Sequence, residues 1–177
     1  MDNYKKIIEE AREKKINKRF GNTSIEHARI LTREILLDAN HYIKILTNNF
    51  NNYFYSKLLQ DIINFLQKNK KNYIEIIVGK NENKKNELIN ELKKQFSKQI
   101  KVYYLGYDNF PIDNDTKERI NFIINDNHAY RYEYSDKEIN YGIVKAIANF
   151  NNQEENKILN NIFEDLKQIA QKEEINK

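Results

Sequence analysis

The pattern of apolar and polar positions divides most of the chain into alternating helices and strands. Apolar side chains recur at helical spacing over residues 3–15, 24–39, 54–66, 84–97 and 153–172. Short β-rich runs lie between them at 41–47, 73–79 and 100–106. The run YIEIIVG at 73–79 is nearly continuously apolar, as expected for a strand buried on both faces. Strands and helices alternating at these lengths predict parallel strands with right-handed crossovers.

Two helices carry signals of where they begin. Thr23-Ser-Ile-Glu26 places a carboxylate three residues after a hydroxyl, which is the capping-box pattern. The last helix is expected to begin after Asn152. Its predicted core-facing side chains are Ile158, Leu159, Ile162, Phe163, Leu166 and Ile169. We expect residues 1–22 to form an N-terminal helix and connector, and residues 23–177 to form one α/β domain.

The alternation of strands and helices ends after a polar loop that contains Pro111. The runs RINFIIND (119–126) and HAYRYEY (128–134) are so close together that they predict an antiparallel hairpin, with its turn at Asp126-Asn127, where both residues tolerate positive φ. A further strand is expected within 141–150. The predicted fold class is therefore α/β, with a mixed, mainly parallel sheet flanked by helices and a late antiparallel hairpin.

The hairpin is unusually rich in polar side chains, and its period of two gives them direction. Arg119 and Asn121 share one face of the first strand, and Arg131 and Glu133 share one face of the second. Opposed Arg and Glu side chains on a sheet commonly form cross-strand ion pairs, which favours a structural role for Asp126 and Glu133. A site for a phosphate is the alternative interpretation.

Composition removes several classes of chemistry. The chain has no cysteine and three histidines, which exclude disulfides and thiol chemistry and predict neither a metal site nor a cofactor. VGKNENKKN follows a predicted strand, but Gly79 is its only glycine, so a phosphate-binding P-loop is not predicted. With 32% charged residues, a mean hydropathy of −0.87 and neither a membrane span nor a secretory signal, we expect a cytoplasmic protein without membrane contact.

Positive charge is concentrated in the middle of the chain. The net charge is +4, and ten lysines stand against four glutamates between Lys68 and Lys101. A surface of this kind attracts phosphate backbones, although lysine and asparagine are abundant throughout. The lysines predicted to contact a nucleic acid are Lys68, Lys70, Lys71, Lys80, Lys84, Lys85, Lys93 and Lys94.

The order of elements from Thr23 to the final helix resembles one half of a phospholipase D superfamily domain. Helix SIEHARILTREILLDA, strand HYIKILT and strand YIEIIVG follow the order of that family, and RINFIIND has the shape of its late catalytic strand. The segments AYRYE and AIANFNN, followed by a helix containing Phe163, are similar to the end of small degenerate members. The resemblance implies a phospholipase D-like fold over about 150 residues.

The resemblance also implies which positions carried the chemistry. The catalytic strand of the family reads His-x-Lys, four further residues, then Asp; Arg119 stands at the histidine, Asn121 at the lysine and Asp126 at the aspartate. In the family the histidine attacks phosphorus and the lysine stabilises the phosphate oxygens. A guanidinium is no nucleophile and an amide carries no charge, so the resemblance implies no catalytic residues here. The Gly-Ser-x-Asn stretch of the family is missing, although Asn149 stands at its asparagine.

We therefore expect a non-catalytic phospholipase D-like module for binding or assembly. The candidate phosphate-binding residues are Arg119, Asn121, Arg131, Lys145 and Asn149. Because active members place two halves face to face, the resemblance implies a homodimer or pairing with another protein. The alternative function is a metal-independent phosphodiesterase or nuclease with an unorthodox nucleophile, for which His128 is the candidate, although its side chain has the opposite parity from Arg131.

Overall fold

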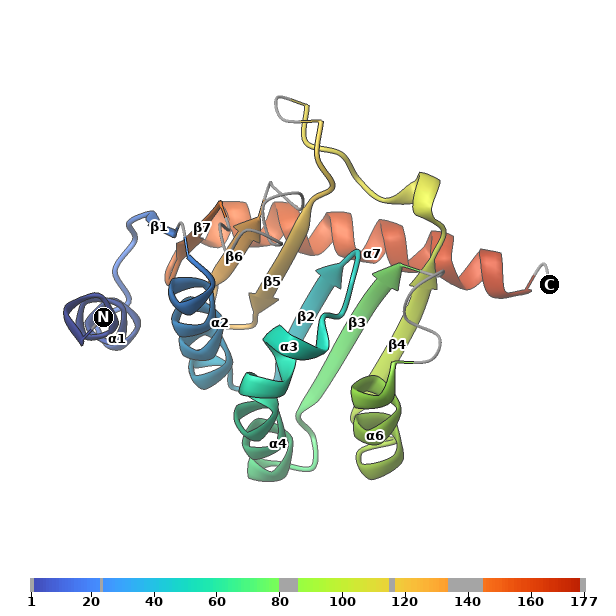
Figure 1. Cartoon of the computed structure of the whole chain (residues 1–177), viewed down its shortest axis with the longest axis horizontal. Coiled ribbons are helices and arrows are strands. Elements are labelled where there is room, and N and C mark those ends of the chain that lie inside the picture. The colour runs from blue at the N-terminus through green and yellow to red at the C-terminus, as the bar shows by residue number, and fades with distance from the viewer. Residues whose placement is uncertain (1, 23, 80–85, 115–116, 134–144, 176–177) are drawn as a thin grey trace.

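A computed structural model describes residues 2–22, 24–79, 86–114, 117–133 and 145–175. These residues form a seven-stranded sheet in the order β1-β7-β6-β5-β2-β3-β4 (Figure 1). The strands are β1 (Phe20–Asn22), β2 (Tyr42–Thr47), β3 (Tyr73–Gly79), β4 (Ile100–Leu105), β5 (Asn121–Asn125), β6 (Tyr130–Glu133) and β7 (Ala146–Asn149). The helices are α1 (Asp2–Glu13), α2 (Ile25–Asp38), α3 (Asn52–Tyr55), α4 (Leu59–Lys68), α6 (Glu87–Gln95) and α7 (Gln153–Ile175), with 3₁₀ turns at Ser56–Leu58 and Tyr107–Asn109.

One half of the sheet is parallel, as the alternation of strands and helices predicts. β2 pairs with β3 and β3 with β4, so that Ile45, Ile76 and Val102 lie side by side. The segments that connect these strands contain α4 and α6. All three strands are confirmed, and the apolar run of β3 is buried along almost its whole length.

The other half is antiparallel. β5 pairs with β2 on one side and with β6 on the other, which confirms the predicted hairpin and the mixed sheet. The sheet is not mainly parallel as expected, because two of the pairings between the described strands are parallel and four are antiparallel. β7 confirms a strand within 141–150; residues 141–144 lie outside the described residues. The last strand in this half, β1, was not predicted, because three residues carry too little periodicity to identify a strand.

The turn of the hairpin differs from the expectation. The residue with positive φ is His128, at 66°, and not Asp126 or Asn127. The reason is the side chain of Asn125, whose Oδ1 accepts hydrogen bonds from the backbone N–H groups of Asn127 and Ala129 at 3.0 Å each. These bonds fix the backbone of the turn, so that its residue with positive φ is the last one, His128.

Helices cover the two faces of the sheet unequally (Figure 1). The near face in that view carries α1, α2, α4 and α6, and its core includes Ile8 and Ala11 of α1 together with Leu31 and Ile35 of α2. The far face carries only α7 among the described helices, and its core includes Leu46, Phe122 and Phe163. α7 crosses that face near the carboxyl ends of β3 and β4.

Two predictions about helices are corrected, one on the N-cap of α2 and one on the core-facing residues of α7. The N-cap of α2 is Ser24, whose Oγ accepts from the His27 N–H, whereas Thr23 lies outside the described residues. Asn152 caps α7 as predicted, by accepting from the Glu155 N–H at 3.0 Å. Ile158 and Ile169 do not face the core, being 53% and 38% exposed.

The rotation of α7 explains these two exposed isoleucines. Asn156 is buried, and its amide donates to the backbone carbonyls of Asn125 and Ala129. With Asn156 facing the sheet, the buried stripe continues through Leu159, Phe163, Leu166 and Ala170. Within the described part of the chain, no helix combines the length and apolar character needed to cross a membrane.

Candidate functional site

The candidate site lies where the carboxyl end of β2 meets the hairpin. Asn121, the first residue of β5, is directly opposite Glu133, the last residue of β6. The Asn121 side chain is buried, and its Oδ1 accepts a hydrogen bond of 2.8 Å from the backbone N–H of Asn48, just beyond β2. We call this end of the sheet, with Asn121, Arg131 and Glu133, the hairpin edge.

Arg131 and Glu133 pair along one strand rather than across two. Nη2 of Arg131 is 2.7 Å from Oε2 of Glu133, and both side chains are less than one-tenth exposed. Arg131 faces Ile123 across the ladder, and Glu133 faces Asn121, so the expected cross-strand ion pair is wrong. The parity prediction explains the observed pair, because residues two apart on a strand point to the same face. The positive charge of Arg131 is thus matched by Glu133.

Residues from the N-terminal segment and from α3 surround this pair. Nε of Arg131 donates to Oδ1 of Asn22 in β1 at 3.4 Å. Burial, together with the Glu133 carboxylate, raises the pKa of Tyr55 above its usual range against the opposing effects of Arg131 and Thr47. Burial likewise raises the pKa of Tyr4 to about 12, with Arg131 acting against it. Both hydroxyls are therefore neutral at physiological pH.

A stacked aromatic pair closes this side of the edge. The Tyr4 ring lies on the His27 ring with 3.8 Å between centroids, and its hydroxyl donates to the Gly21 carbonyl. Sequence reasoning missed Tyr4, Asn22, His27 and Tyr55 as members of the cluster. No spacing signal connects them, because they stand on four separate elements, α1, β1, α2 and α3, which come together only in the fold.

Arg119 lies just before β5. Its guanidinium carbon is 3.2 Å from the centroid of the Tyr107 ring, a cation–π contact, and its backbone pairs with Ile112 in an isolated bridge. The residue at the family's histidine position is therefore held against an aromatic ring, and the residue at its lysine position is a hydrogen-bonded amide.

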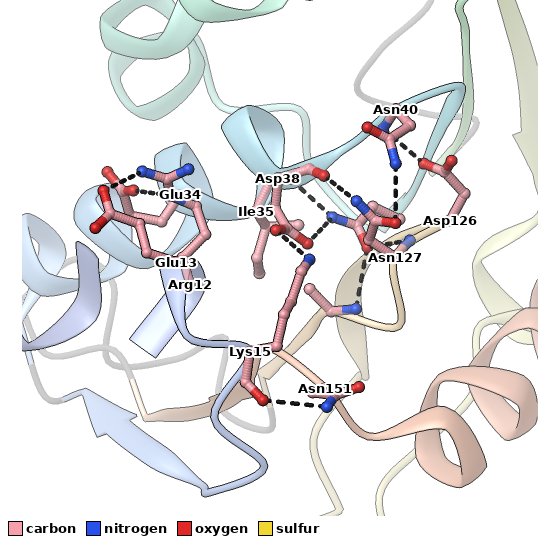
Figure 2. A network of polar contacts seen from close by, with 12 residues as sticks. Arg12, Glu13, Lys15, Glu34, Ile35, Asp38, Asn40, Asp126, Asn127 and Asn151 are labelled. Atoms are coloured by element: carbon pink, nitrogen blue, oxygen red, sulfur yellow. Dashed lines mark hydrogen bonds and ion pairs between the residues drawn. The ribbon is translucent and has the colours of Figure 1, made fainter. Parts of the chain in front are cut away.

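Asp126 lies at the opposite end of the hairpin, within a polar network (Figure 2). Its carboxylate accepts hydrogen bonds from the backbone N–H groups of Asn40, His41 and Tyr42 at 3.0 to 3.4 Å. Its neighbour Asn127 donates to the Asp38 carbonyl. These bonds fasten the hairpin turn to the segment between α2 and β2.

The remaining candidates are divided between the two ends of the sheet. Lys145 is exposed and precedes Ala146, which pairs with Glu133, so Lys145 stands at the hairpin edge. Asn149 pairs with Tyr130, at the other end of β6, and donates to Asn17. His128 is at the turn, away from Glu133. The structure thus brings Asn121, Arg131 and Lys145 to one edge, whereas Arg119 packs on Tyr107, and Asn149 and His128 lie toward the turn of the hairpin.

The lysine-rich region forms a second surface on the far face. Lys70, Lys71, Lys98 and Lys101 line a groove of about 390 Å³ with residues from β2, β3 and α7. Of the other lysines predicted to contact nucleic acid, Lys93 and Lys94 lie on α6, Lys68 ends α4, and Lys80, Lys84 and Lys85 lie outside the described residues. Among the described residues, no group of histidines and carboxylates is arranged to hold a metal ion.

The fold is similar to those of several solved structures, among them Nuc, NucT and TrmBL2. Nuc from Salmonella typhimurium, a phospholipase D family member, aligns with a TM-score of 0.60 at 17% identity, covering 85% of this chain and 94% of Nuc. NucT from Helicobacter pylori aligns at 0.60 and 12% identity, covering 85% of this chain and 96% of NucT. TrmBL2, an archaeal chromatin protein that binds DNA, aligns at 0.61 and 15% identity over 93% of this chain.

These likenesses confirm the fold implied by the sequence resemblance. The chain has a phospholipase D-like α/β fold. It spans 57% of the length of TrmBL2. No protein-family model matches the sequence, and no curated protein matches it.

Proposed function

We propose that this chain is a non-catalytic phospholipase D-like binding module with affinity for nucleic acid. The hairpin edge is the observation that supports the absence of catalysis in this proposal. There the lysine position is the buried amide of Asn121, and the cation beside it, Arg131, is paired with Glu133. An attack on phosphorus needs a nucleophile and uncompensated positive charge for the phosphate oxygens. The described side chains of this edge supply little of either.

The proposed affinity for nucleic acid is supported by the charge of one surface and by the fold. A lysine-lined groove lies on the far face, and the fold is shared with a protein that binds DNA. Asn121, Arg131 and Lys145 remain the candidates for a phosphate site at the hairpin edge. Arg119 and Asn149, the other two candidates, make contacts elsewhere, Arg119 with the Tyr107 ring and Asn149 with Asn17. Homodimerisation, or pairing with another protein, belongs to the same proposal.

One observation favours the alternative, a metal-independent phosphodiesterase. His27 is held by its stack on Tyr4 beside the Arg131 cluster, so an imidazole does lie near the hairpin edge. His128, the sequence-based candidate, lies at the turn instead. His27 is therefore the residue to test first for an unorthodox nucleophile.

A phosphodiesterase assay in EDTA separates the two functions. Purified chain is incubated with bis-p-nitrophenyl phosphate and with single- and double-stranded DNA, beside His27→Ala and His128→Ala variants. We expect no turnover above the buffer rate for any of the three. Turnover that His27→Ala or His128→Ala abolishes, with the variant still folded by circular dichroism, would establish the phosphodiesterase and overturn the non-catalytic proposal.

A further inference from the structure

We propose that the part of the far sheet face left open by α7 is a docking surface for single-stranded nucleic acid. The inference rests on the nucleic-acid affinity proposed above and assigns that affinity to one surface. This surface, here called the lysine groove, lies beside Tyr42, Tyr73 and Lys101 at the amino ends of β2, β3 and β4. It is distinct from the hairpin edge, because Lys44 and Glu75 contact α7 on the far face, whereas Arg131 pairs with Ile123, whose side chain belongs to the near-face core.

The floor of the lysine groove is electrically balanced. Lys44 is buried, and its Nζ is 2.6 Å from Oε1 of Glu164 and donates to Asn160. Lys167 contacts Glu164 at 2.8 Å and Glu75 at 3.2 Å. Each of the two glutamates in the groove is thus matched by a lysine, so neither is available to neutralise the rim.

The rim of the groove keeps its charge. Lys70, Lys71 and Lys101 are exposed lysines that line the groove, as is Lys98. Across the described residues, none of these four ammonium groups takes part in an ion pair. Four exposed ammonium groups around a neutral floor suit a chain of phosphates, because neutralising the phosphates releases the counterions of the nucleic acid.

The ring of Tyr73 lines the groove together with these lysines. Tyr42 and Tyr73 are cross-strand neighbours whose rings stack with 5.8 Å between centroids and 28° between planes. Both rings are half-buried, so part of each remains accessible on the sheet face. Their hydroxyls stay neutral at physiological pH, since burial raises both pKa values.

The combination of rings and lysines favours a single strand over a duplex. Bases in a duplex are already stacked and hidden, whereas unpaired bases stack on aromatic side chains while lysines follow the backbone. An open sheet face that presents rings between cations offers both contacts at once. A duplex offers this surface only its phosphates, and should therefore bind more weakly.

Binding by the full-length chain tests the assignment. The probes are a fluorescein-labelled 20-nucleotide oligo(dT) and a 20-bp duplex, followed by anisotropy at about 50 and 200 mM salt. One variant carries Lys70→Gln, Lys98→Gln and Lys101→Gln. A matched control removes the same charge from exposed lysines that lie outside the groove and outside the predicted nucleic-acid contacts, through Lys6→Gln, Lys18→Gln and Lys57→Gln. The ring contribution is tested by Tyr73→Ala against Tyr73→Phe.

We expect the groove variant to weaken oligo(dT) binding about 10- to 100-fold and to flatten the salt dependence by about two units of slope, since each phosphate contact contributes about 0.7. The control should change affinity less than about 3-fold. Tyr73→Ala should weaken the affinity for oligo(dT) about 5-fold or more, and Tyr73→Phe should bind oligo(dT) like wild type.

Each other outcome has a definite meaning. Equal losses in the groove and control variants would overturn the lysine groove as the site and leave nucleic-acid affinity standing. Duplex binding as tight as oligo(dT), with no effect of Tyr73→Ala in a folded variant, would overturn the single-strand assignment. Absence of binding to both probes at low salt would overturn the nucleic-acid half of the proposed function itself, independently of the phosphodiesterase assay.

Discussion

Arg131 and Glu133 form an ion pair between alternate residues of one strand, 2.7 Å apart and almost completely buried. Each charge has lost its water and depends on the other for compensation. We predict that Glu133→Ala lowers the free energy of unfolding by about 3 to 5 kcal/mol, because it leaves the guanidinium buried without its partner. Urea denaturation followed by circular dichroism measures the change.

The double variant Arg131→Met/Glu133→Leu is the control for this first prediction. It removes both charges and keeps similar volume, so its stability should lie within about 1.5 kcal/mol of wild type. A loss below about 1 kcal/mol in Glu133→Ala would contradict the prediction, because exposed ion pairs contribute no more than that.

Phosphate affinity at the hairpin edge should depend on the same carboxylate. In wild type, Glu133 competes with any anion for Arg131. Glu133→Gln keeps the shape and removes the competing charge, so inorganic phosphate should bind about tenfold more tightly, which is the effect of one charge-assisted hydrogen bond. Isothermal titration measures this, and Arg131→Leu/Glu133→Gln should abolish the gain. Equal phosphate affinity in wild type and Glu133→Gln would argue against a phosphate site at Arg131.

Asp126 should matter for stability even without catalysis. Its carboxylate accepts from three consecutive backbone N–H groups between α2 and β2. Asp126→Asn replaces one accepting oxygen with a donor and should lower the unfolding free energy by about 1 to 3 kcal/mol. Asp165→Asn, at an exposed position on α7, is the matched control and should change it by less than about 0.5 kcal/mol. Equal values for both variants would contradict this role.

The elements that the sequence predicts well are those that carry their own periodicity. β3 and α2 are long enough for apolar spacing to identify them, and the hairpin parity correctly puts Arg131 and Glu133 on one face. The position of a turn depends on side chains that bond to the backbone. Asn125 shifted the left-handed residue to His128 in a way that apolar spacing does not encode.

The candidate site was less predictable because it is assembled from distant segments. β1 brings Asn22 to Arg131 only through its pairing with β7, and Tyr4 reaches the same place because α1 packs on α2. In the lysine groove, Tyr42 and Tyr73 become neighbours through strand register. Sequence position alone indicates none of these contacts, although it did locate the concentration of lysines.

The predicted association state rests on the resemblance to the phospholipase D family. We predict a homodimer, or a complex with another protein, because active members bring two halves together at the catalytic edge. Size-exclusion chromatography with light scattering should give about twice the chain mass of 21.4 kDa. A strict monomer at high protein concentration would remove the homodimer prediction and leave pairing with another protein.

The acid stability of the protein should depend on Glu164. Burial acts to raise the pKa of Glu164, but hydrogen bonds from Lys167 and Lys44 outweigh it and hold that pKa below its usual 4.5. A carboxylate with a lowered folded-state pKa contributes stability in full above its unfolded pKa, and the contribution disappears as pH falls through the folded value. The unfolding temperature of wild type should therefore decrease as the pH is lowered below about 4.5, and protonation of Glu164 should account for part of this decrease.

The difference between wild type and Glu164→Gln isolates this contribution. Near pH 7 the variant should melt at a lower temperature, because Lys44 and Lys167 lose the carboxylate between them. Below about pH 4.5 the two melting curves should converge, since wild type then loses the same charge by protonation. Asp165→Asn should instead follow wild type at every pH. Parallel curves for wild type and Glu164→Gln down to pH 2 would show that the Lys44–Glu164–Lys167 cluster adds no pH-dependent stability, because protonation would then leave the difference unchanged.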